Sequence, residues 1–258
     1  MRVAVVGGTG VVGRHVVEAL RDSGHEPAVI ARSTGVDVAA GTGLDAALVG
    51  AEVIVDVGNV AASAKAKSVA FFEAATTNLI TAAAKAGVGH LVTLSIVGCD
   101  RVDLGYYFGK RRQEELVAAG PVPFTILRAT QFHEFPGQLI DRLPKAPAAL
   151  VPVMTVPRMR SQPIAAREAG QALAQIAAAA PMGRAPDLAG PQVHDMPDLV
   201  RLVWRARGNR RPVVGFRVPG RMGKALAGGG LLPDGPGPRG TQTFAEWLGS
   251  QVGKAAVD

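Results

Sequence analysis

The chain has 258 residues, of which 48% are hydrophobic and 5% aromatic, and its formal net charge is +7 at pH 7. This length allows one large α/β domain, and the single cysteine, Cys99, excludes an internal disulfide. No apolar run approaches the roughly 20 residues that cross a bilayer, and the histidines lack metal-ligand spacing. The first predicted strand starts by residue 2, which leaves no room for a signal peptide. We therefore expect a cytoplasmic protein without a membrane segment or a metal site.

The first predicted element is a strand that leads directly into a glycine-rich turn. Residues 3–6 are Val-Ala-Val-Val, and Gly7, Gly10 and Gly13 follow at intervals of three. An amphipathic helix comes next and ends at Gly24. A buried strand, a tight turn and a helix N-terminus together form an anion site, because bare backbone and free N–H groups can approach a pyrophosphate. The pattern predicts a nucleotide cofactor site in this turn.

Strands and helices continue to alternate up to about residue 135. We predict strands at residues 26–31, 36–39, 52–57, 90–96 and 124–129, and helices at residues 61–86 and 107–119. The strands are continuous apolar runs, which is typical of a parallel sheet that helices cover on both faces. The predicted fold is therefore α/β, a Rossmann-type doubly wound parallel sheet with its ligand at the carboxyl ends of the strands.

Beyond residue 135 the alternation is less regular. Short apolar runs at residues 149–154 and 212–218 are interspersed with predicted helices at 165–180, 197–207 and 244–252, and a loop rich in glycine and proline covers residues 227–240. We predict one NAD(P)-binding domain over residues 1–258. Its core spans about 1–135, and the elements from about 136 to 258 form a small C-terminal substrate lobe.

The basic excess lies entirely in the C-terminal part of the sequence. Residues 151–258 carry 14 Lys and Arg against 7 Asp and Glu, whereas residues 1–150 carry 14 of each kind. Only Trp204 and Phe216 interleave with the arginines, and no helix-turn-helix or zinc-finger spacing accompanies them. We interpret the excess as a solvated arginine-rich face, and we do not expect nucleic acid as a partner.

The residues that follow the second predicted strand indicate which nicotinamide cofactor the turn binds. Arg32 and Ser33 lie about 20 residues beyond the glycine motif, where an acidic residue would bind the ribose 2′-hydroxyl of NAD. An arginine there accommodates the 2′-phosphate of NADP instead. Arg32 and the hydroxyl of Ser33 can hold that phosphate through charge-assisted hydrogen bonds. The predicted cofactor is therefore NADP(H).

Three further residues suggest redox chemistry. Tyr106 and Lys110 are four residues apart at the start of a predicted helix and so project to one side of it. An ammonium group close to a phenol favours the phenolate, which can exchange a proton with a carbonyl or an alcohol. Ser95, near the end of the preceding strand, could orient the substrate oxygen. We predict Tyr106 as the proton donor, with Lys110 and Ser95 as the other catalytic residues.

These segments together resemble the atypical short-chain dehydrogenase/reductase superfamily. Within it the chain is similar to the branch of NmrA-like and NAD(P)H-binding quinone-reductase-like proteins. The resemblance rests on the glycine motif, on Leu94-Ser95-Ile96-Val97-Gly98 and on Tyr106-Tyr107-Phe108-Gly109-Lys110. It implies a Rossmann-type fold and an NADP cofactor, with these contact residues: Gly7, Thr9, Gly10, Val11, Val12, Gly13, Arg32, Ser33, Val57, Gly58, Ser95 and Lys110.

The expected activity is oxidoreduction of a carbonyl or quinone-like small molecule, and a homodimer is compatible with the long predicted helices. Two alternatives stay open. Members of this branch include NADP-binding redox sensors that do not turn the cofactor over, and the basic C-terminal part fits a sensor slightly better. A sugar-nucleotide epimerase or dehydratase would use the same Tyr-Lys chemistry, but Arg32 and the short chain argue against it.

Overall fold

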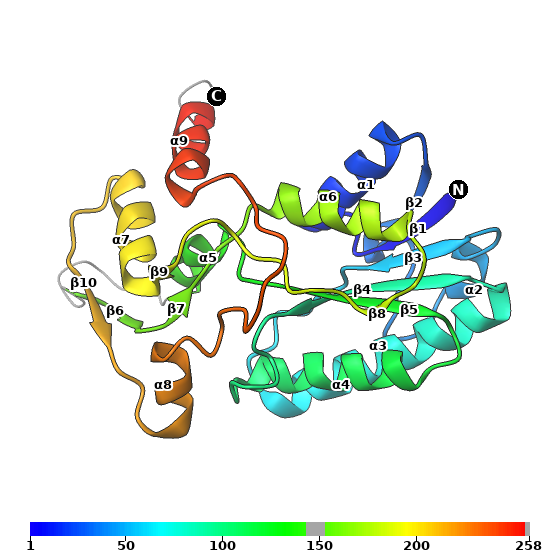
Figure 1. Cartoon of the computed structure of the whole chain (residues 1–258), viewed down its shortest axis with the longest axis horizontal. Coiled ribbons are helices and arrows are strands. Elements are labelled where there is room, and N and C mark those ends of the chain that lie inside the picture. Colours follow the sequence, from blue (N-terminus) through cyan, green and yellow to red (C-terminus); the bar gives the residue numbers. More distant parts are fainter. Residues whose placement is uncertain (143–152, 256–258) are drawn as a thin grey trace. The chain divides into compact units, whose positions relative to one another are not determined.

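A computed structural model describes residues 1–142 and 153–255 of the chain. It divides into two compact units (Figure 1). The first unit comprises Met1–Ala129 and Ala166–Asp187, and the second comprises Thr130–Ala165 and Leu188–Asp258.

The first unit is built on a six-stranded sheet in which every pairing is parallel. The strand order is β2-β1-β3-β4-β5-β8. The strands are β1 (Arg2–Val6), β2 (Glu26–Ile30), β3 (Val53–Asp56), β4 (His90–Ile96), β5 (Phe124–Ala129) and β8 (Gly183–Arg184). The chain leaves β1 toward β2 on one side and returns to β3 on the other, so the direction of winding reverses at β1. Such a switch point is where open α/β sheets bind their ligands.

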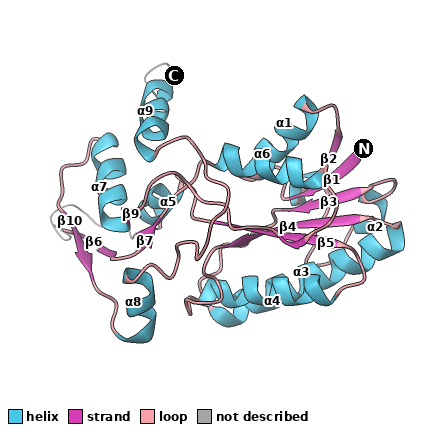
Figure 2. Ribbon diagram, viewed as in Figure 1, coloured by secondary structure: helices cyan, strands magenta, loops and turns pink. Residues whose placement is uncertain are grey.

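Helices cover both faces of this sheet (Figure 2). Helices α1 (Gly13–Asp22) and α6 (Ala166–Ala177) pack together on one face, and α3 (Lys65–Ala86) packs with α4 (Gly105–Ala119) on the other. A short helix, α2 (Leu44–Ala47), adjoins α3. The buried stripe of α1 comprises Val16, Val17 and Leu20, which matches the apolar periodicity of the sequence. The predicted Rossmann-type doubly wound sheet is confirmed.

Two expectations about the elements of the first unit need correction. The strand predicted at residues 36–39 does not form. Oδ1 of Asp37 accepts hydrogen bonds from the backbone N–H groups of Ala39 (2.9 Å) and Ala40 (3.1 Å), and this holds the segment in a tight turn. Residues 166–187, which we assigned to the C-terminal lobe, instead belong to the first unit, because α6 packs on α1 and β8 extends the sheet beyond β5.

The second unit contains two small sheets and four helices in its described residues. Strand β6 (Met154–Pro157) pairs in parallel with β10 (Val213–Phe216), and β7 (Arg160–Ser161) pairs antiparallel with β9 (His194–Asp195). The helices are α5 (Phe135–Asp141), α7 (Met196–Ala206), α8 (Gly220–Ala227) and α9 (Phe244–Ala255). Of the apolar run predicted at 149–154, residues 149–152 lie outside the described residues.

In the described parts of the chain, no helix has both the length and the apolar character that a membrane crossing requires.

Candidate functional site

The glycine turn between β1 and α1 has the backbone that a nucleotide cradle needs. Gly7 has a φ of 76°, a backbone angle that residues with a side chain rarely adopt. A Cβ on Gly13 would lie 2.1 Å from the carbonyl oxygen of Gly7, so only glycine lets the first turn of α1 approach the end of β1 this closely. Thr9 and Gly10 are exposed at the tip of the turn, and Val12 is buried beneath it. The turn is therefore closely packed on the side that faces the protein interior and open on the side that faces solvent.

The loop after β3 lies directly against this turn. A Cβ on Gly7 would lie 2.9 Å from the carbonyl oxygen of Val57 and 3.1 Å from the Cα of Gly58. The sheet register explains the contact, because Val6 at the end of β1 is level with Asp56 at the end of β3. The predicted contact residues in the two loops, 7–13 and 57–58, therefore lie together at the switch point.

Arg32 and Ser33 follow β2, the strand on the other side of β1. They begin a short 3₁₀ helix, Arg32–Thr34, and both are exposed. The hydrogen bond from the backbone N–H of Gly7 to the carbonyl oxygen of Ile30 (2.8 Å) joins the end of β2 to the glycine turn. An arginine side chain is long enough to reach a group on the same edge of the sheet.

Tyr106, in the first turn of α4, also reaches this edge. Its hydroxyl donates a hydrogen bond of 2.7 Å to Oδ1 of Asn59, the residue that follows Gly58. Helix α4 is held in place by close packing on α3, since a Cβ on Gly109 would lie 2.2 Å from Oγ of Ser68. The Ser68 hydroxyl in turn donates to the carbonyl oxygen of Tyr106 at 2.9 Å. Tyr106 is half-buried, so its hydroxyl can meet a bound molecule.

Lys110 lies one turn further along α4 and is only 3% exposed. Its ammonium group donates to the carbonyl oxygen of Leu94 (2.7 Å) and to Oε1 of Gln113, and it lies 4.7 Å from the centroid of the Phe72 ring. Burial lowers the pKa of Lys110 to about 8, although the nearby Asp56 carboxylate favours the charged form. Lys110 is thus a buried cation of reduced basicity.

Asp56 is the buried counterpart of Lys110. Its Oδ1 accepts from the backbone N–H of Gly58 and its Oδ2 from Nε2 of Gln113, both at 2.8 Å. Burial raises the pKa of Asp56, and Lys110 opposes this effect. The carboxylate therefore ties the loop after β3, which adjoins the glycine turn, to α4, which carries Tyr106.

Ser95 makes different contacts from those of Tyr106 and Lys110. It is 2% exposed, and its hydroxyl lies 3.9 Å from Sγ of Cys99. Sγ of Cys99 lies 3.5 Å from Oε1 of Glu114, and burial raises the pKa of this thiol to about 11. The contacts of Ser95 belong to this buried network, and its substrate-orienting role stays a prediction.

Sequence reasoning missed Asn59, Asp56 and Gln113 at this site. Asn59 and Asp56 flank Val57 and Gly58, so their place at the end of a buried strand was a signal that could have found them. Gln113 carries no such signal, because a glutamine on a helix is usually a surface residue.

The residues present fit a dinucleotide cofactor. The close approach that Gly7 and Gly13 allow leaves backbone at the point where a pyrophosphate would bind, in front of the N-terminus of a ten-residue helix. The loop after β3 borders the same turn, and Arg32 can contribute a positive charge. A phenol on a half-buried helix turn, at the same edge of the sheet, could exchange a proton with a substrate held there.

A family model described as NAD(P)H-binding matches residues 7–152, more than half of the chain. No curated protein matches the chain in a sequence search.

Solved structures share the fold at low sequence identity. The NADPH-dependent quinone oxidoreductase from Escherichia coli, complexed with NADPH, aligns with a TM-score of 0.71 and 19% identity over 96% of this chain and 99% of that one. A short-chain dehydrogenase/reductase superfamily protein from Agrobacterium tumefaciens with bound NAD aligns at 0.67 and 19%, over 100% and 98%. The UDP-N-acetylglucosamine 4-epimerase from Bacillus cereus aligns at 0.68 and 17%, over 97% and 96%. The chain therefore belongs to the NAD(P)H-binding family, and it binds a nicotinamide cofactor.

Proposed function

We propose that this protein is an NADPH-dependent oxidoreductase that reduces a carbonyl or quinone-like group on a small molecule. The observation that carries the proposal is the hydrogen bond from the Tyr106 hydroxyl to Asn59, one residue beyond the loop that contacts the glycine turn. It holds an acid–base group at the edge of the sheet where the cofactor turn lies. The E. coli quinone oxidoreductase, an NADPH-dependent protein of the same fold, supports this reaction class.

The choice of NADPH over NADH rests on Arg32. It is exposed and is the second residue after β2, where an arginine can pair with a 2′-phosphate. Solved structures of this fold hold either cofactor, so the preference is part of the proposal.

In the proposed reaction, bound NADPH supplies the hydride. Tyr106 donates the proton to the substrate oxygen, with its hydroxyl oriented by Asn59. Lys110 contributes a positive charge on the same side of α4, which favours the phenolate that remains after proton transfer. The proton and the hydride together convert a carbonyl into an alcohol. For a quinone, the same hydride and proton supply the two electrons and the two hydrogens that the hydroquinone needs.

The test is NADPH oxidation against a panel of small carbonyls and quinones, by wild type and by Tyr106→Phe. We expect the variant to lose about 100-fold or more in kcat, the scale of general acid catalysis, while its NADPH affinity stays within about twofold. Tyr107→Phe removes a hydroxyl from the neighbouring tyrosine and should keep kcat. A fully active Tyr106→Phe enzyme would remove Tyr106 from the mechanism.

Ser95 can be tested in the same assay. Ser95→Ala should lower kcat if its hydroxyl orients the substrate oxygen. A variant with unchanged kcat and a lower melting temperature would show that Ser95 only supports the buried network with Cys99 and Glu114.

One observation favours a second candidate function, an NADP-binding redox sensor without turnover. The ammonium group of Lys110 is already engaged by Leu94 and Gln113, as expected for a structural cation. Binding of both NADP⁺ and NADPH by wild type, with no oxidation across the panel and with a salt-sensitive macromolecular partner, would favour the sensor.

A further inference from the structure

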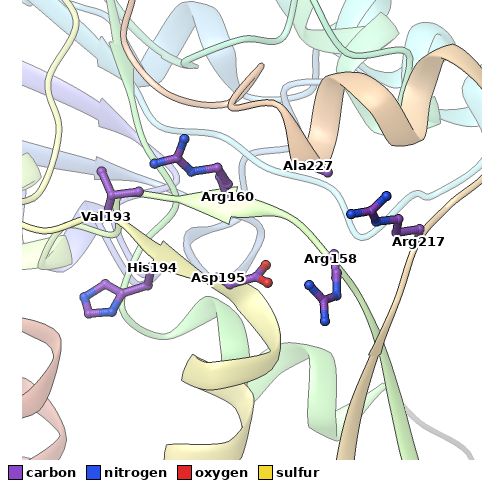
Figure 3. A pocket seen from close by; sticks show the side chains of 7 residues that line it. All are labelled: Arg158, Arg160, Val193, His194, Asp195, Arg217 and Ala227. Atoms are coloured by element: carbon purple, nitrogen blue, oxygen red, sulfur yellow. The ribbon is translucent and has the colours of Figure 1, made fainter.

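The second unit contains a basic pocket that the proposed redox function does not use. Its volume is about 380 Å³, within the range of small-molecule sites. The lining residues are Arg158, Arg160, Val193, His194, Asp195, Arg217 and Ala227, all of them in the second unit (Figure 3). Three arginines against one aspartate give the lining a formal charge of +2.

The backbone brings two of these arginines together. Strands β6 and β10 are parallel neighbours, and their last residues, Pro157 and Phe216, are level with each other. Arg158 and Arg217 are the next residues on each strand, so both emerge from adjacent carboxyl ends (Figure 3). The backbone N–H of Arg158 donates to the carbonyl oxygen of Phe216 at 2.8 Å, which fixes the first arginine beside the second strand. Like charges at the ends of neighbouring strands repel each other, and an anion bound between them would relieve this repulsion.

The third arginine comes from the other small sheet. Arg160 is on β7, level with Asp195 of β9. The Asp195 carboxylate accepts the backbone N–H of Met159 at 3.1 Å, which partly satisfies its negative charge. Over residues 1–142 and 153–255, no ion pair joins Arg158, Arg160 or Arg217 to a carboxylate. By contrast, Arg201 and Arg207 of the same unit pair with Asp198 and Asp141.

We propose that this pocket binds a phosphate group, held by Arg158, Arg160 and Arg217. Guanidinium groups bind phosphate oxygens in pairs of parallel hydrogen bonds, and three of them can surround one phosphate. A phosphate carries about −1.5 to −2 charges at pH 7, which balances the lining charge, whereas a monocarboxylate carries one. The ligand is an inorganic phosphate or a small phosphomonoester, and this inference does not depend on the redox activity.

The experiment is calorimetric titration of the full chain at constant ionic strength, with inorganic phosphate, glycerol 3-phosphate and acetate as probes. We expect one saturable site per chain for the first two. Tighter binding of the ester would identify an organic phosphate as the ligand, and equal binding would identify the phosphate group alone. Acetate binding as strong as that of phosphate would overturn the proposal, as would the lack of any saturable phosphate site.

Variants locate the site. Arg158→Gln and Arg217→Gln should each weaken phosphate binding about tenfold or more, the scale of one lost charged hydrogen bond. Arg205→Gln removes an exposed arginine of α7 that is outside the pocket, and it should bind phosphate like wild type. Arg32→Gln tests the competing site at the dinucleotide turn and should also bind like wild type. Loss of binding in Arg32→Gln but not in Arg158→Gln, or equal loss in Arg205→Gln, would overturn the proposal. If Arg158→Gln fails to fold, Arg217→Lys keeps the charge and should still lose affinity.

Discussion

Gln113 links the buried cation Lys110 to the buried carboxylate Asp56: its Oε1 accepts from the lysine and its Nε2 donates to Oδ2 of the aspartate at 2.8 Å. The two charges join α4, which carries Tyr106, to the end of β3, which adjoins the cofactor turn. A change in the charge of Lys110 should therefore affect the proposed catalytic residue, Tyr106.

The first prediction concerns pH. Because the pKa of Lys110 is lowered from 10.5 to about 8, the ammonium group loses its proton as pH rises through about 8. On the proposed mechanism kcat/KM should fall above that pH. Lys110→Met should be less active than wild type below about pH 8 and should lack this decrease, so the two enzymes converge as pH rises. The measurement is kcat/KM from pH 6 to 10 (about two pH units on each side of the pKa).

Stability should move in the opposite direction, which separates the two effects. Between about pH 8 and 10.5 the unfolded chain keeps the Lys110 proton and the folded chain does not, so the contribution of this group to the free energy of unfolding rises with pH. Urea titrations at the same pH values would check this. An activity loss above pH 8 that parallels global unfolding would contradict the assignment to Lys110.

The second prediction concerns cofactor choice. Arg32→Gln should weaken NADPH binding about tenfold to 100-fold, the scale of lost charged hydrogen bonds, and should leave NADH binding unchanged. Arg21→Gln, which changes an exposed arginine in the last turn of α1, is the matched control. Fluorescence titration with both cofactors measures the effect. Equal loss for NADPH and NADH would show that Arg32 does not contact the 2′-phosphate.

The third prediction concerns the glycine turn. In Gly13→Ala the new Cβ would lie 2.1 Å from the carbonyl oxygen of Gly7, so the turn and the start of α1 must move apart. We expect NADPH and NADH affinities to fall together, by about tenfold or more, a cost of about 1.4 kcal/mol. Gly249→Ala, where the added Cβ meets no neighbour within 4 Å, should bind both cofactors normally. Normal binding by Gly13→Ala would contradict the placement of the pyrophosphate at this turn.

Local patterns in the sequence were enough to predict the sheet and the cofactor turn. The glycine spacing and the continuous apolar strands depend on neighbouring residues only, and they correctly predict β1 to β5 with helices α1, α3 and α4. The short helix α2 was not predicted, and the strand predicted at residues 36–39 does not form. In that segment Val36 and Val38 alternate with Asp37 as in a strand. Hydrogen bonds from the backbone to the Asp37 side chain hold the segment in a turn instead. Strand β8 has two residues, too few for any periodicity, so its place in the sheet could not be predicted.

The interior of the site could not be predicted because it depends on pairs of residues that are distant in sequence. Asp56 and Gln113 are 57 positions apart, and no motif couples a strand-end carboxylate to a helix amide. A helix was predicted at residues 165–180, but not that α6 would pack on α1 in the first unit. A hydrophobic face indicates that a helix packs against another element, but it does not identify that element. The prediction for Ser95 rested on its place in the sequence shortly before Tyr106. In the structure its hydroxyl lies 3.9 Å from Sγ of Cys99, a contact that chain order does not indicate.

The fourth prediction concerns an ion network around the buried Arg128 in the first unit. Arg128 on β5 is 5% exposed and donates two hydrogen bonds to Glu114, at 2.8 and 2.6 Å, and one to Asp100 at 2.6 Å. Burial opposes ionisation of Glu114, but Arg128 outweighs it and holds the pKa of that carboxyl below its usual range. Arg128→Met would leave the carboxylate buried without its cation. The free energy of unfolding at pH 7 should fall by about 3–5 kcal/mol.

The pH dependence and a second substitution distinguish a lost ion pair from a packing defect. Without Arg128 the pKa of Glu114 rises above its usual value, so protonation at acid pH relieves the penalty and the variant approaches wild type as pH falls toward 4 (about the ordinary carboxyl pKa). Arg128→Met combined with Glu114→Leu should recover part of the stability at pH 7, because no unpaired charge remains buried. Arg112→Met, which breaks an exposed pair with Glu73, should change stability far less. If urea titrations gave the same loss at pH 4 and pH 7, and no recovery in the double variant, the cost would come from packing and not from the unpaired carboxylate.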